Sequence, residues 1–138
     1  MAAIGELIRI ESNQTISFGD YTLDAKAKLD NFEFAGDIYK VKTFREITKL
    51  ERNGLFVYES VPGTAVNCFA QREDEVEFTV EGPEDAQITL GLAEDAEYEV
   101  SIDGASVGTM KTTLGGKVSF SVELENADAV RVQVVKHA

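Results

Sequence analysis

The chain has 138 residues, of which 43% are hydrophobic and 28% charged, and its 13 basic and 25 acidic side chains give a formal net charge of −12. This length and apolar content predict one folded domain or two small ones, and exclude a disordered chain. The negative charge argues against nucleic acid and anionic lipid as partners, because both are bound by clustered lysine and arginine.

The first 62 residues predict a series of strands joined by turns. Asn53-Gly54 is a strong hairpin signal, because both residue types tolerate positive φ. Its return strand is 55–58, and a hairpin also needs an outgoing strand. We therefore prefer strand to helix for the residues before the turn, with 48–52 as the outgoing strand. A type II turn is expected at Pro62-Gly63, and residues 23–34 stay ambiguous. The expected strands are 6–11, 15–21, 38–43, 48–52 and 55–58.

The strand at 55–58 is apolar at every position. Alternation places Phe56 and Tyr58 on one face and Leu55 and Val57 on the other. A strand that is apolar on both faces lies between two layers. We therefore expect it in the centre of the fold or across a subunit interface, and a ligand surface remains a third alternative.

After Gly63 the pattern becomes regular alternation with period two. Apolar β-branched and aromatic residues alternate with Glu, Ser and Thr, which is typical of half-buried strands. Turn signals such as Gly82-Pro83 and Asp103-Gly104 recur about every 8–12 residues, so six or seven short strands and no helix are expected, as in a β-sandwich or barrel. The clearest runs are 75–81, 88–92, 97–102, 118–124 and 130–134.

Together these patterns predict an all-β protein. Residues 1–62 form an antiparallel, aromatic-rich region with a net charge of −2, and residues 63–138 form an acidic sandwich of the Ig-like or jelly-roll type with a net charge of −10. The two parts pack together and can share one core, because about 60 residues form only a marginal core alone. The near-neutral first part is the expected contact region.

Chemistry-bearing motifs are sparse. Acidic clusters at Glu73-Asp74 and Glu94-Asp95 are weak metal candidates, and their main interpretation is solvated loop charge. We expect no cofactor, because the chain shows no phosphate loop, dinucleotide fingerprint or zinc spacing. Cys68 is expected to be a small buried hydrophobe, and His137 is the only histidine, which argues against a nucleophilic triad.

The N-terminus shows no signal-peptide pattern, and no apolar run is long enough to span a bilayer. A cytoplasmic protein is therefore expected. Association with a cell surface or a phage particle remains an alternative.

Several stretches resemble a group of small all-β bacterial proteins from gut anaerobes, some of which carry the label endosialidase. The resemblance covers most of the chain and is carried by residues 39–44, 46–51, 53–54, 57–66, 80–90, 108–112 and 114–117. That label implies a glycoside hydrolase. However, Ser101-Ile102-Asp103-Gly104 has its glycine one position too early for a sialidase Asp-box, no Trp follows, and the five arginines are scattered in sequence. The resemblance therefore assigns no catalytic residue to this chain.

The C-terminal part is weakly similar to Ig-like sandwich modules of bacterial carbohydrate enzymes.

Three functional hypotheses follow. The first is a non-enzymatic structural or interaction module that self-associates, as a homo-oligomer or with a protein partner, through Leu55, Phe56, Val57 and Tyr58. The second is a carbohydrate-binding module in which Tyr21, Tyr39 or Tyr58 stacks on a glycan. The third and weakest is a glycoside hydrolase, which needs a cleft with paired carboxylates.

Overall fold

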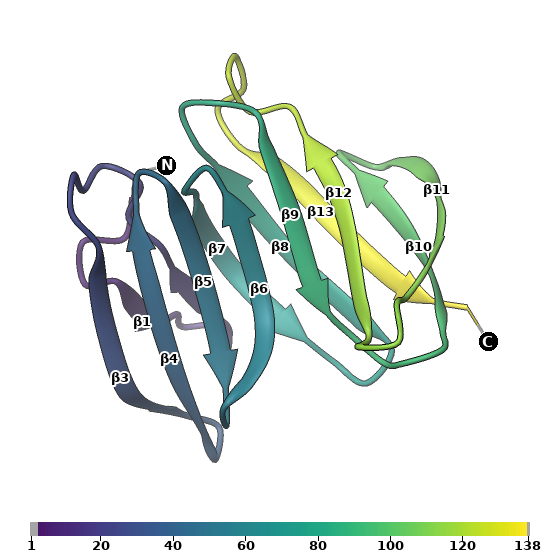
Figure 1. Cartoon of the computed structure of the whole chain (residues 1–138), viewed down its shortest axis with the longest axis horizontal. Coiled ribbons are helices and arrows are strands. Elements are labelled where there is room, and N and C mark those ends of the chain that lie inside the picture. The colour runs from purple at the N-terminus through teal and green to yellow at the C-terminus, as the bar shows by residue number, and fades with distance from the viewer. Residues whose placement is uncertain (1–2, 138) are drawn as a thin grey trace.

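Residues 3–137, which the computed structural model describes, form thirteen strands and no helix (Figure 1). The strands build two antiparallel sheets that pack on a common hydrophobic core, which confirms the predicted all-β fold class. None of these residues forms an apolar helix that could cross a membrane. In spatial order, the seven-stranded sheet contains β1 (Ile8–Ile10), β2 (Ile16–Phe18), β7 (Ala65–Gln71), β8 (Glu75–Glu81), β13 (Val130–Lys136), β10 (Glu97–Ile102) and β11 (Ala105–Lys111). The six-stranded sheet contains β12 (Lys117–Val122), β9 (Ala86–Gly91), β6 (Leu55–Val61), β5 (Ile47–Arg52), β4 (Asp37–Phe44) and β3 (Ala27–Phe34).

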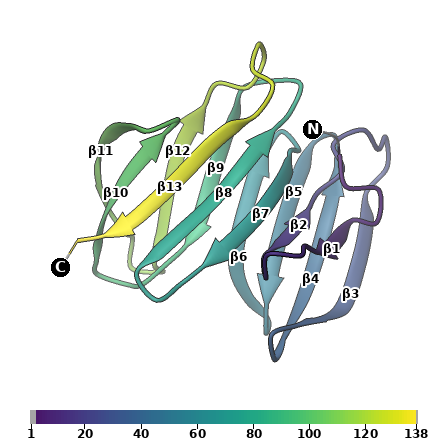
Figure 2. The same ribbon diagram turned by 180° about the vertical axis from the view of Figure 1, so that it is seen from behind.

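Both sheets contain strands from before and after residue 62. In the seven-stranded sheet, seen from behind in Figure 2, β2 pairs with β7. In the six-stranded sheet, β6 pairs with β9. The sheets therefore continue across the sequence position where charge and aromatic content change, and the buried core draws on strands from both sides of it.

The turn between β5 and β6 confirms the hairpin signal, since Asn53 and Gly54 have φ values of 52° and 79°. The expected type II turn at Pro62-Gly63 is wrong, because that turn needs positive φ at Gly63, and this glycine is not among the residues with positive φ. The Val61–Pro62 peptide is cis. Gly63 serves close packing instead: a Cβ atom there would lie 2.0 Å from the carbonyl oxygen of Phe44.

A bulge in β6 corrects the expected alternation of residues 55–58. Tyr58 lies opposite Leu50, but Phe56 lies opposite Glu51, so Val57 is an extra residue in the ladder. Val57 and Tyr58 are consequently both buried, whereas Phe56 lies on the outer face of the sheet. The alternation was predicted without a bulge, and one inserted residue reverses the face of every side chain before it.

A second bulge explains the wrong prediction for Cys68. The register of β7 against β8 shifts between Asn67 and Ala70, and Cys68 has a φ of 55°. The extra residue turns its side chain out of the sandwich, so the thiol is exposed rather than buried.

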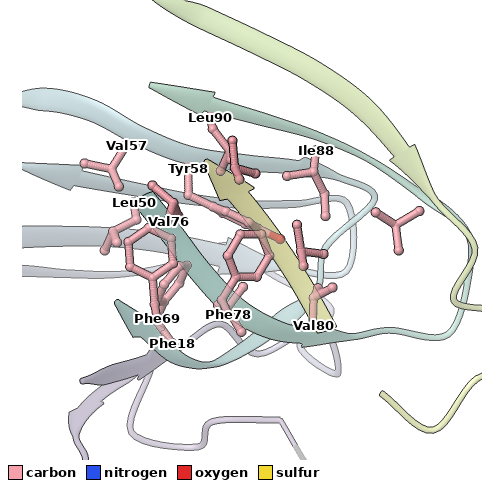
Figure 3. Packing of buried hydrophobic residues seen from close by; sticks show 14 of the residues in the cluster. Phe18, Leu50, Val57, Tyr58, Phe69, Val76, Phe78, Val80, Ile88 and Leu90 are labelled. Carbon is pink, nitrogen blue, oxygen red and sulfur yellow. The ribbon is translucent and has the colours of Figure 1, made fainter. Parts of the chain in front are cut away.

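The centre of the core combines aromatic rings with a chain of buried hydroxyl groups. Tyr58 contacts Phe18 and Phe78 edge-to-face, with ring centroids 5.3 and 5.7 Å apart (Figure 3). Its hydroxyl group lies 2.8 Å from that of Thr64, and Thr64 is also hydrogen-bonded to Ser60. Burial raises the pKa of Tyr58 well above its ordinary value, so the phenol stays neutral.

Candidate functional site

The turns at the end of the sandwich that is lowest in Figure 1 line two adjoining clefts. The larger cleft has a volume of about 440 Å³. The β5–β6 hairpin, the β7–β8 turn, the β9–β10 loop and the start of β12 line it. Its lining includes Leu55, Phe56, Leu92, Tyr98 and Lys117.

The second cleft has a volume of about 380 Å³ and lies beside the first. The turn between β1 and β2, the turn between β3 and β4, and the end of β7 line it. Phe34 and Tyr39 contribute aromatic rings to this cleft, and Asn13, Gln14 and Asp37 contribute polar groups.

Arg52, Gln71 and Arg72 line both clefts and therefore mark the boundary between them. The guanidinium group of Arg72 lies 3.3 Å from the carboxylate of Glu75. Burial raises the pKa of Tyr39, and the positive charge of Arg52 partly opposes that rise. The shared boundary thus offers two cationic groups and one amide to a ligand that spans both clefts.

The structure places four of the six predicted contact residues at these clefts. Leu55, Phe56 and Val57 line the larger one and Tyr39 lines the smaller one. Leu55 is 72% exposed, whereas Val57 is buried. The ring of Phe56 lies under the ammonium group of Lys117, at 4.5 Å from nitrogen to ring centroid. Phe56 therefore links the larger cleft to the outer face of the six-stranded sheet.

The predicted tyrosine platforms are not on the surface as a group. Tyr58 is completely buried and Tyr39 is 6% exposed, so neither offers an open ring face to a sugar. Tyr21 is half-buried and lines neither of the two clefts. Stacking on these three side chains therefore does not describe one site.

The weak metal candidates are separate from one another. Glu73 lines the larger cleft, while Asp74, Glu94 and Asp95 are exposed on turns. Among residues 3–137, no group of three or more His, Cys, Asp or Glu side chains is arranged to hold a metal ion.

Sequence reasoning missed Arg52, Gln71 and Arg72. The one signal that could have found Arg52 is its position directly before the Asn53-Gly54 turn, whereas no strand was predicted to end at Gln71, where β7 ends. The sequence position does not show that the β5–β6 turn and the β7–β8 turn lie at the same end of the sandwich. No family model, curated protein or solved structure matches the chain.

Proposed function

We propose that this protein is a non-enzymatic interaction module that self-associates through the outer face of its six-stranded sheet and the adjoining end of the sandwich. The observation that carries the proposal is the apolar edge formed by Leu55 and Phe56. Leu55 is 72% exposed and lies beside a cleft of about 440 Å³, and Phe56 faces outward at the same edge. An exposed apolar surface beside a cleft is one that a second copy can cover.

The test is sedimentation velocity on the whole chain over a concentration series, comparing wild type with Leu55→Glu. A charged side chain at the centre of an apolar contact should weaken association by roughly tenfold or more. Val107→Glu is the matched control, because Val107 is also exposed, at 51%, but lies on the edge strand β11. A wild-type protein that stays monomeric throughout, or equal effects of both substitutions, would contradict the proposal.

The joined clefts favour a second candidate, a glycan-binding module. Arg52, Gln71 and Arg72 supply hydrogen-bond donors where the clefts meet, and half-buried Phe34 and Phe56 supply apolar surface in either cleft. Sugar recognition needs this combination of directional polar groups and apolar surface. A glycan array should show hits that Gln71→Ala removes and that Gln87→Ala, at an exposed position of β9 outside both clefts, leaves unchanged. An array without hits would exclude this candidate.

A further inference from the structure

The outer face of the six-stranded sheet carries three lysines in a row on neighbouring strands. Lys28 of β3 lies opposite Lys42 of β4, which in turn lies opposite Lys49 of β5. Neighbouring strands are about 4.8 Å apart, and like charges directly opposite each other destabilise a sheet. Lys26 and Lys40 lie next to this row. We call these five lysines the lysine face.

The lysine face is only partly neutralised by its own sheet. Lys40 lies 4.0 Å from Asp30, and Lys49 lies 3.6 Å from Glu51. The ion pairs found within residues 3–137 include none of Lys26, Lys28 and Lys42. Repulsion, first from Lys40 and next from Lys28, lowers the pKa of Lys42. An acidic surface placed on this face would relieve that repulsion.

The same chain carries such an acidic surface on two loops that touch. The loop between β8 and β9, residues 82–85, and the loop between β12 and β13, residues 123–129, contain no Lys or Arg. A carboxylate oxygen of Asp85 accepts hydrogen bonds from the backbone N–H groups of Leu124 and Glu125, at 2.9 and 3.1 Å. These segments are called the acidic loops; their exposed acids are Glu84, Asp85, Glu123, Glu125 and Asp128.

The two charged surfaces cannot meet within one copy. The acidic loops extend from the end of the sandwich that is uppermost in Figure 1, next to β9 and β12. The lysine face lies on the outer side of β3, β4 and β5, and β6 separates these strands from β9 and β12. One surface is a projecting end and the other is a sheet face, so a contact between the two needs a second copy.

We propose that the acidic loops of one copy dock on the lysine face of the next copy in a head-to-tail contact. This inference rests on the proposed self-association and names the acidic loops as the partner surface. Phe56 borders the lysine face, since the ammonium group of Lys49 lies 6.0 Å from its ring centroid. Because the surfaces differ, a bound pair leaves one of each free, and association continues as an open chain. At physiological salt, screening over about 8 Å limits the general repulsion between copies of charge −12, so the facing groups decide the orientation.

The test is charge exchange, followed by sedimentation velocity in about 0.1 M salt. Lys28→Glu/Lys42→Glu places an acidic face against acidic loops, and Glu125→Lys/Asp128→Lys places basic loops against the lysine face. Each double variant alone should associate roughly tenfold or more weakly than wild type. An equimolar mixture of the two should associate again, because both reversed surfaces then find opposite charges.

Matched controls make the same changes in charge elsewhere. Lys111→Glu/Lys136→Glu and Glu94→Lys/Glu97→Lys alter exposed side chains outside both surfaces and should leave association close to wild type. All variants change exposed or half-buried outward-facing side chains, and thermal unfolding followed by circular dichroism verifies that each is folded.

The outcomes separate this inference from the proposed function. Wild type that is monomeric at every concentration overturns both. Association that persists in the double variants, or a mixture that does not regain it, overturns the docking assignment and leaves self-association standing. In that case, loss of dextran sulfate binding by Lys28→Glu/Lys42→Glu would assign the lysine face to a polyanion instead of a second copy.

Discussion

Two regions of the core are built from different side chains. Where β10, β12 and β13 meet, the buried residues are mainly valines, such as Val100, Val118 and Val132. Where β2, β6, β7 and β8 meet, the core contains the ring of Tyr58 among three phenylalanines, next to four buried hydroxyl residues. The first we call the valine region and the second the aromatic–hydroxyl region.

The difference shows two ways of joining a pair of sheets. In the valine region, the sheets are held together by the burial of apolar surface. This hydrophobic stabilisation does not depend on the direction of the contacts. The aromatic–hydroxyl region adds directional contacts. Thr48 bonds the backbone of Thr64, which follows β6, and Thr43 bonds both Thr48 and the backbone N–H of Asp20, which follows β2. These hydrogen bonds hold the segment after β2 and the segment after β6, both of which connect the two sheets, against the six-stranded sheet.

The largest expected effect is the loss of a ring from the aromatic–hydroxyl region. Phe78→Ala should lower the free energy of unfolding by about 3–5 kcal/mol, because it removes a buried side chain and leaves a cavity beside Tyr58. Val132→Ala in the valine region removes less volume and should cost roughly 2 kcal/mol. Urea unfolding with linear extrapolation measures both. Equal losses would mean that the two regions contribute alike.

Removing the hydroxyl group of Thr64 should lower the free energy of unfolding by a smaller amount. Thr64→Val keeps the shape but leaves the hydroxyls of Tyr58 and Ser60 without this partner, which should cost about 1–3 kcal/mol. Thr79→Val, on the outer side of β8, is the control and should be close to neutral. A double-mutant cycle with Tyr58→Phe should be non-additive. Strict additivity would argue against a coupled network.

The valine region was predictable from the sequence, and the aromatic–hydroxyl region was not. Alternation alone places Val118 and Val132 inside, because each strand is regular and one of its faces is polar. The burial of Thr48 and Thr64 depends on their bonding each other across 16 positions of sequence. The secondary-structure propensities of neighbouring residues do not predict a hydrogen bond between residues so far apart in the sequence.

The candidate site was predicted only in part for a related reason. Apolar content singled out residues 55–58 in the sequence, but their faces were assigned without the bulge at Val57, which depends on the register against β5. The lysines alternate visibly at 26, 28, 40 and 42, yet they become a row only when β3, β4 and β5 pair in the observed register. Total charge hid this row, because acids elsewhere outweigh it.

The smallest expected effect concerns the lysine face of an isolated copy. Lys42→Gln removes a charge that faces Lys28 and Lys49 directly, so the midpoint of thermal unfolding should rise in about 0.1 M salt and the gain should shrink in about 1 M salt. Lys136→Gln, at the end of β13, is the control and should change the midpoint less.

The stability difference between Lys42→Gln and wild type should also depend on pH, in a direction that the lowered pKa of Lys42 fixes. Because the pKa of Lys42 is lowered in the folded protein, the unfolded chain binds more protons there between the folded value and the ordinary value of 10.5. Stability from this group therefore rises as the pH increases through that interval, and the stability advantage of Lys42→Gln over wild type should decrease as the pH rises towards 10.5. If the variant is instead less stable than wild type at low salt, packing of the aliphatic stem of Lys42 outweighs the repulsion. The row would then be a stabilising feature of the monomer, and docking of an acidic surface would have no strain to relieve.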